Sequence, residues 1–168
     1  MKEWIPIPGS VKSNIIAAAL KAFGEKGYQN VHVKTLAKEV GVTTGAIYHH
    51  FESKINLYRI VREEIERRIV DRMEGAAALF NDSVTAMRAA LLVAFDAAVK
   101  FHVCRLLSEP DPSNGPDRIQ DCLLSLADEA SRDIALLLPA TWRAALAAVD
   151  DQRLSPEAGR KALERLLQ

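Results

Sequence analysis

The sequence lacks the patterns that mark membrane, secreted and metal-binding proteins. No apolar run approaches the roughly 20 residues that a membrane-spanning helix needs, and the opening stretch MKEWIPIPGS has no continuous apolar core of the kind found in signal peptides. The only two cysteines, Cys104 and Cys122, do not have the CxxC spacing of a zinc site or a redox motif. We therefore expect a cytoplasmic protein in which both thiols are reduced and packed.

Aromatic residues are also scarce, at 6% of the 168 residues, whereas Ala, Leu, Arg and Glu recur in long stretches. With 49% hydrophobic and 26% charged residues, the composition is that of a globular protein and not of a disordered one. The length suits one domain, or a small module joined to a slightly larger one. Together these features predict an all-α fold.

The chain has no net charge, which by itself argues against a nucleic-acid-binding protein, but its charges are unevenly distributed. Residues 1–59 contain eight Lys and Arg residues against four Asp and Glu residues, and the rest of the chain contains 14 against 18. The first third is therefore basic and the remainder acidic. This asymmetry favours a short module that binds a polyanion, carried by a body with another task.

Hydrophobic periodicity and capping residues predict short helices in the basic third. The first begins at Ser10 or Ser13, either of which can cap it, and ends at Gly27. The second spans residues 33–40 and ends at Gly41, because glycine takes a left-handed conformation without steric cost. Hydroxyl side chains then cap a third and a fourth helix, at Thr43 and Ser53.

The acidic remainder is predicted to be helical as well. One apolar stripe runs over residues 53–80, with a kink or an end at Gly75, and another runs over residues 84–108. The run EPDPSNGPD is a loop. We expect a further helix that Pro139 limits, a short helix after it, and a last helix that Ser155 caps.

The two helices on either side of VGVT meet the steric requirements of a helix-turn-helix motif over about residues 33–52. Ala37 is small where the helices cross, Gly41 supplies the turn, and Ile47 inserts the second helix into the core. Any corner between two helices that contains a glycine can imitate this spacing. The interpretation therefore needs support from other residues.

That support comes from three stretches: AFGEKGY before the second helix, LAKEVGV in the turn, and GAIYHHFESKINL from the third helix into the fourth. With them, residues 15–58 closely resemble the N-terminal domain of the tetracycline-repressor (TetR-like) family of bacterial transcription regulators. The resemblance implies an N-terminal three-helix helix-turn-helix DNA-binding domain over residues 9–69. A helical body over residues 70–168, which binds an effector and dimerises, is expected to follow.

The expected DNA contacts come from three places in this domain. The start of the second helix offers a cation, a hydroxyl and backbone N–H groups to a phosphate, at Lys34 and Thr35. The first turn of the third helix is the part that such motifs present to base edges in the major groove, and it consists of Thr43, Thr44, Gly45 and Ala46. The family resemblance adds phosphate contacts at Tyr48, His50 and Lys54, and a base or phosphate contact at His49.

Other interpretations of these residues remain open. Tyr48 and His50 can instead pack against the first helix or hydrogen-bond to a carbonyl, and Lys34 and Lys54 can be solvated surface charges. A metal site at His49 and His50 is not expected, because neighbouring residues on a helix point about 100° apart and no third ligand is near. The chain also departs from the family pattern at two positions: His32 stands where a Ser or Thr cap is usual, and Thr44 where a basic residue is common.

The body is expected to supply a dimer interface and an effector pocket. Alanines at 140, 144, 145, 147 and 148 permit close approach of helices, and the candidate interface residues are Trp142, Leu146, Leu163, Leu166 and Leu167. The alternative is that these side chains are buried within their own subunit. The candidate pocket residues are Phe80, Met87, Phe95, His102 and Trp142, for which the alternative is a place in the core.

These expectations combine into a dimeric repressor that a small-molecule effector releases from a palindromic operator in double-stranded DNA. The alternative with the same fold is a regulator that needs no effector or responds to a protein partner. An enzyme is not expected, because the sequence shows no nucleophile with a base, no carboxylate pair and no metal-ligand spacing. No cofactor, metal or membrane association is expected either.

Overall fold

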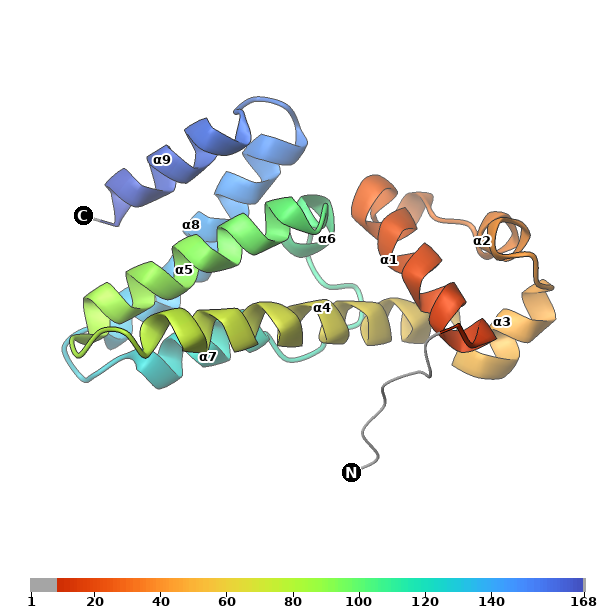
Figure 1. Cartoon of the computed structure of the whole chain (residues 1–168), viewed down its shortest axis with the longest axis horizontal. Coiled ribbons are helices and arrows are strands. Elements are labelled where there is room, and N and C mark those ends of the chain that lie inside the picture. Colours follow the sequence, from red (N-terminus) through yellow and green to blue (C-terminus); the bar gives the residue numbers. More distant parts are fainter. Residues whose placement is uncertain (1–8, 168) are drawn as a thin grey trace.

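The basic third folds as three short helices packed around the start of a fourth. The structure, a computed structural model, describes residues 9–167, within which it has nine helices and no strand. The first three helices are α1 (Val11–Asn30), α2 (Val33–Val40) and α3 (Thr44–Phe51). They form a compact head at one end of the molecule (Figure 1).

The local signals in the head act as the sequence predicts. The backbone N–H of Ala46 donates to Thr43 Oγ1 over 3.1 Å, and that of Asn56 donates to Ser53 Oγ over 3.1 Å, so both hydroxyls cap their helices. Gly41 is left-handed, with φ 76°, and ends α2. Gly27 has φ 71° and interrupts α1, although one more turn follows it.

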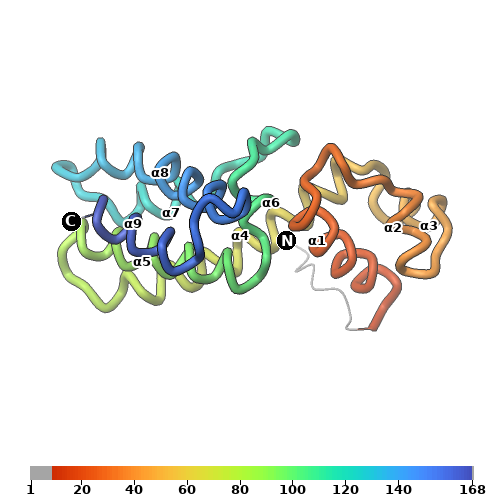
Figure 2. Tube along the Cα trace, turned by 90° about the horizontal axis from the view of Figure 1, so that it is seen from above, coloured from red at the N-terminus to blue at the C-terminus, as the bar shows by residue number. Residues whose placement is uncertain are grey.

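Helix α4 (Lys54–Ala77) belongs to both the head and the body, and Figure 2 shows it as the connection between the two lobes. It passes through Gly75 and ends two residues later. Phe80 therefore lies beyond the helix, and its side chain is 43% exposed. The expectation that Phe80 continues the buried stripe and lines a pocket is wrong, because the chain has already left the helix.

The expected helix over residues 84–108 is two helices, α5 (Ser83–Lys100) and α6 (Cys104–Ser108). At the break, the N–H of Val103 donates to the carbonyl of Ala98 and that of His102 to the carbonyl of Val99, each over 3.0 Å. This pair of bonds is a Schellman motif, in which His102 takes the left-handed position with φ 56°. His102 consequently points to solvent, and its assignment to the effector pocket is wrong.

The remaining helices are α7 (Arg118–Leu126), α8 (Arg132–Asp150) and α9 (Pro156–Leu166). Pro139 lies inside α8 and does not end it, which corrects the expected boundary. The helix continues because Ala135, Leu138 and Trp142 lie on one buried face, and their packing outweighs the backbone bond that proline cannot make. Ser155 caps α9 as predicted.

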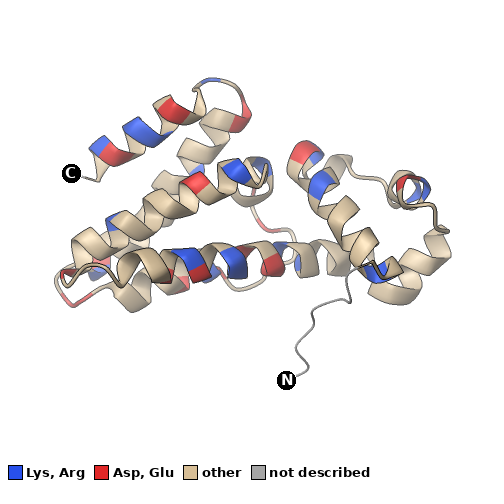
Figure 3. Cartoon of the chain, in the orientation of Figure 1, with Lys and Arg blue, Asp and Glu red and all other residues tan. Residues whose placement is uncertain are grey.

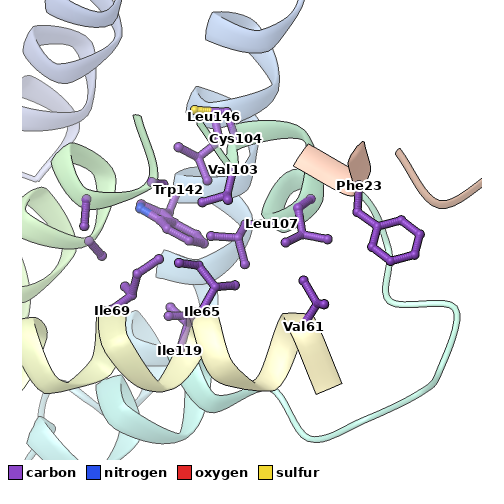
Figure 4. Close-up of a cluster of buried hydrophobic side chains, with 14 of the residues drawn as sticks. Phe23, Val61, Ile65, Ile69, Val103, Cys104, Leu107, Ile119, Trp142 and Leu146 are labelled. Atoms are coloured by element: carbon purple, nitrogen blue, oxygen red, sulfur yellow. The ribbon is translucent and has the colours of Figure 1, made fainter. Parts of the chain in front are cut away.

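The body has an apolar core at the centre of which Trp142 lies fully buried. Figure 4 shows its ring between side chains of α4, α6, α7 and α8, among them Ile65, Leu107 and Ile119. The two cysteines are free and buried, as predicted, and burial raises the pKa of both thiols to about 11.

Three of the five candidate interface residues are core residues of their own subunit. Trp142 and Leu146 have no exposed surface and Leu163 has 1%, so these side chains cannot contact another molecule at the surface. These residues recur at the spacing of one helix face. The same spacing arises whether that face is buried in the subunit's own core or in an interface with another subunit, so the sequence alone does not distinguish the two. Leu166, in contrast, is 72% exposed and Leu167 is partly buried.

None of the helices within residues 9–167 is long and apolar enough to cross a membrane. The expectation about a signal peptide rests on the opening stretch of the sequence, of which residues 1–8 lie outside the described part of the chain.

Candidate nucleic-acid interface

The helix-turn-helix buries one face of each helix and leaves the opposite faces open. Leu36 and Ala37 of α2 are each 2% exposed, and Ile47 and Phe51 of α3 are at most 1% exposed. These apolar side chains fix α2 and α3 on α1 and α4. The polar side chains of both helices are consequently presented on the outer surface of the head.

The first turn of α3 is small, uncharged and exposed. Thr43, Thr44 and Gly45 are exposed and Ala46 is partly buried. A Cβ added to Gly45 meets only Thr43 Oγ1, at 3.7 Å, so the space above this turn is open. No Lys, Arg, Asp or Glu lies anywhere on α3, which is uniformly tan in Figure 3. This turn therefore allows a close approach of another molecule to the helix backbone.

The second turn of α3 carries the aromatic and imidazole side chains. Tyr48 is 46% exposed, and His49 and His50 are exposed with their ring centroids 5.5 Å apart. Their exposure keeps the side chains of Tyr48 and His50 out of the core of the head. A phenol and two imidazoles on one exposed turn can donate hydrogen bonds to phosphate oxygens.

Lys54 is the first residue of α4, where the positive end of the helix dipole reinforces its charge. Its ammonium lies over the ring of Tyr28, with Nζ 4.2 Å from the ring centroid. Desolvation by this partial burial lowers the pKa of Lys54 from its ordinary value. Sequence reasoning selected Lys54 but missed Tyr28, although Tyr28 stands within the quoted stretch AFGEKGY.

The start of α2 is exposed but is capped less well than the starts of α3 and α4. His32 occupies the N-cap position, and its side chain makes no capping hydrogen bond. Its carbonyl instead accepts from the N–H groups of Thr35 and Leu36, at 3.0 and 3.1 Å. Lys34 and Thr35 are both exposed, so the structure leaves their side chains available to an anion.

A buried polar network joins the head to the body, and the sequence did not reveal it. Arg62 of α4 is 5% exposed and Glu66 is 3% exposed, and Arg62 Nε donates to Glu66 Oε1 over 2.9 Å. Arg62 Nη1 donates to the hydroxyl of Tyr58 and to the carbonyls of Leu106 and Glu109, over 3.0, 2.9 and 3.2 Å. This guanidinium thus fixes α4 to α6 and to the loop that follows it.

The remaining pocket candidates, Met87, Phe95 and Trp142, are at most 1% exposed and belong to the body's core. One polar atom there is unusual, because Trp142 Nε1 is buried without a hydrogen-bond partner.

A hollow of about 90 Å³ lies elsewhere, in the head between α1 and α2, lined in part by Lys26, His32 and Glu39. It is smaller than the roughly 300–1,000 Å³ typical of ligand pockets.

Comparison with known proteins finds relatives of both the head and the whole fold. The family model described as "Bacterial regulatory proteins, tetR family" matches residues 15–60. A curated relative, the HTH-type transcriptional repressor Rv1474c of Mycobacterium tuberculosis, is 32% identical over 108 residues, which are 62% of this chain and 55% of that protein. The chain spans about half the length of the curated relatives it matches.

Two solved structures extend the likeness over the body. One, described as "Molecular basis for control of antibiotic production by a bacterial hormones", is 27% identical with a TM-score of 0.70, and the match covers 94% of this chain and 96% of that one. The other is the transcriptional regulator FadR from Bacillus subtilis in complex with stearoyl-CoA, at 17% identity and a TM-score of 0.71, covering 93% and 97%. The second likeness concerns the fold alone.

Proposed function

We propose that the chain is a member of the tetR family of bacterial regulatory proteins, whose family model matches residues 15–60, and that it is a transcriptional regulator that binds double-stranded DNA through α3. The observation that carries the proposal is the contrast within α3 between its bare first turn and its ring-bearing second turn. The first turn enters the major groove and reads base edges with Thr43, Thr44 and the backbone near Gly45. Tyr48, His49, His50 and Lys54 then hold the phosphates beside it, and Lys34 and Thr35 hold another.

The operator is proposed to be a palindrome that two copies of the chain bind together. A single helix-turn-helix reads few base pairs, and paired motifs bind half-sites about 34–36 Å apart. On α8, Leu137, Ala140 and Ala144 are exposed at i, i+3 and i+7, so they share one outer face, and Leu137 is 69% exposed. Leu166 of the adjacent helix α9 is 72% exposed, so the body offers small and apolar side chains for an interface between helices.

Regulation is proposed to be repression that a small-molecule effector relieves. The effector is expected to be mainly apolar with at least one hydrogen-bond acceptor, since the N–H of Trp142 has no partner and the side chains around its ring are apolar. A buried donor without a partner costs about 1–3 kcal/mol, which an acceptor on the ligand recovers.

The DNA contacts are tested by titrating the DNA that flanks the protein's own gene. We expect Tyr48→Ala and Lys54→Ala each to weaken binding about tenfold or more, because each removes a contact of about 1 kcal/mol from both protomers. Lys100→Ala, which removes the same charge from an exposed position on α5, is the control and leaves binding unchanged. Native mass spectrometry of the complex is expected to give two protomers per site. Wild-type affinity in both folded variants would refute the contacts.

The effector is tested by thermal denaturation with a panel of acyl and other apolar compounds that carry a carbonyl. A ligand at about 100 times its Kd stabilises the folded state by about 2.7 kcal/mol and raises the melting temperature. We expect Trp142→Phe, which keeps an apolar ring but has no N–H, to lose most of that shift. Operator binding with no shift from any compound would instead favour the regulator that needs no effector or that responds to a protein partner.

A further inference from the structure

Tyr28 lies between Lys54 and the core of the head. It follows Gly27, whose φ of 71° turns the chain at the end of α1. One face of the Tyr28 ring lies under the Lys54 ammonium, at 4.2 Å. Tyr58 meets the ring nearly edge-on, with centroids 5.1 Å apart and an interplanar angle of 76°. Phe23 stacks beside it at 6.3 Å.

We propose that Tyr28 is a positioning residue for DNA binding, whose ring holds the Lys54 ammonium at the partly exposed start of α4 without neutralising it. The inference rests on the proposed phosphate contact of Lys54. An aromatic ring attracts a cation through its quadrupole and adds no negative charge. A carboxylate in the same place would hold the lysine equally well but would cancel the charge that attracts a phosphate.

The electrostatic surroundings of Lys54 fit this role. Within residues 9–167 it makes no salt bridge, whereas Arg59 in the next turn is paired with Glu63 at 3.0 Å. Lys54 is only partly buried, so its N–H donors can still reach a phosphate oxygen. A free lysine side chain loses much rotamer freedom on binding, and a side chain that is already held loses less.

The ring of Tyr28 is itself held by contacts that reach the body. Tyr58, which supports it, accepts a hydrogen bond from Arg62 Nη1 over 3.0 Å. The same Arg62 nitrogen donates to the carbonyl of Leu106 in α6. Lys54, Tyr28, Tyr58 and Arg62 therefore form a continuous set of contacts from the DNA-facing start of α4 to the body.

The test is a double-mutant cycle between Tyr28 and Lys54, read as operator affinity and as its dependence on salt. We expect Tyr28→Leu to weaken binding about 5- to 30-fold for the two copies in a dimer, while Tyr28→Phe, which keeps the ring, stays within about twofold. In the Lys54→Ala background, Tyr28→Leu is expected to cause no further loss. Lys54→Ala also lowers the slope of log K against log salt by about 0.9 per lost phosphate contact, and Tyr28→Leu shifts it in the same direction.

The two proposals fail in different ways. If Tyr28→Leu costs as much with Lys54→Ala as without it, Tyr28 supports only the fold, and the positioning role is overturned while the Lys54 contact stands. If Lys54→Ala changes neither affinity nor slope, the contact itself is wrong, and the positioning role with it. Tyr28→Met, which fills the space without a π face, replaces Tyr28→Leu in the cycle if the leucine variant does not fold.

Discussion

Gly45→Glu is expected to abolish specific operator binding while the protein stays folded. A side chain at this position meets only Thr43 Oγ1 at 3.7 Å, so the free protein accommodates it. Replacing a helical glycine contributes up to about 1 kcal/mol of stability, and an acidic residue in the first turn of a helix is favourable. In the complex, the same side chain puts bulk and negative charge where the helix must enter the groove. We expect a loss of about 1,000-fold, which approaches non-specific affinity.

Gly75→Glu is the matched control. Gly75 is also an exposed helical glycine without a neighbour within 4 Å of an added Cβ, but it lies in the body part of α4. The substitution makes the same change in net charge and a similar change in helix propensity. Electrophoretic mobility shift or fluorescence anisotropy is expected to give wild-type affinity for Gly75→Glu. Equal affinities for the two variants would mean that α3 does not enter the groove.

Arg62→Met is expected to lower the free energy of unfolding by about 3–5 kcal/mol, because it leaves the Glu66 carboxylate buried without its partner. Glu66 is 3% exposed, and the carbonyls of Leu106 and Glu109 lose a donor as well. A loss of this size is a large part of the free energy of unfolding of a typical folded domain, which is about 5–15 kcal/mol. The double variant Arg62→Met with Glu66→Met is expected to recover much of the loss, since it removes the buried charge.

Arg68→Met provides the comparison on the same helix. Arg68 Nε pairs with Glu64 at 2.8 Å in the same i,i+4 arrangement, but the two side chains are 54% and 31% exposed. Exposed pairs contribute about 0–1 kcal/mol, so urea denaturation is expected to show only a small change for Arg68→Met. Losses of equal size in the two variants would contradict the burial of the Arg62 network.

The pH dependence of stability distinguishes a buried charge from a packing defect. Burial raises the pKa of Glu66, although the attraction of Arg62 lowers it in part. A carboxyl whose folded pKa is raised binds more protons in the folded state, so its contribution to stability falls as pH rises above about 4.3, the unfolded value. Without Arg62 the pKa rises further. The deficit of Arg62→Met is therefore expected to shrink from pH 7.5 to pH 5.5, and a constant deficit would indicate lost packing alone.

The helices of the helix-turn-helix could be predicted because the residues that set their boundaries act on the nearby backbone. Gly41, Thr43 and Ser53 each act on the backbone within four residues of themselves, so the end of α2 and the starts of α3 and α4 follow from single positions. The exposure of Tyr48 and His50 follows from the same short helix, since burying Ile47 and Phe51 turns them outward. The sequence therefore predicted the helices of the proposed interface, and the structure leaves the side chains proposed to lie on it exposed or partly exposed.

The body was less predictable because its determinants lie far apart in the sequence. The chain breaks between α5 and α6 without a glycine or proline, and His102 takes the left-handed position instead. Pro139 predicts the end of a helix, but α8 continues past it because its buried face packs against the core. Trp142 and Leu163 fit an interface pattern until the other helices cover them.

The Arg62 network shows the same limit. A charged pair at i,i+4 on a helix resembles a solvated surface pair, as Glu64 and Arg68 indeed are. Only the approach of α6 and its following loop, more than 40 residues away, buries Arg62 and supplies its carbonyl partners. No signal within the sequence of α4 distinguishes the two pairs.

Hydroxyl-radical footprinting of the purified protein on the DNA beside its own gene tests the proposed mode of DNA binding most directly. We expect two protected patches on one face of the duplex, about 34–36 Å apart and related by a two-fold axis. We also expect that Gly75→Glu gives the same footprint and that Gly45→Glu gives none. Protection without two-fold symmetry, or protection that survives Gly45→Glu, would contradict a dimer that reads its operator with α3.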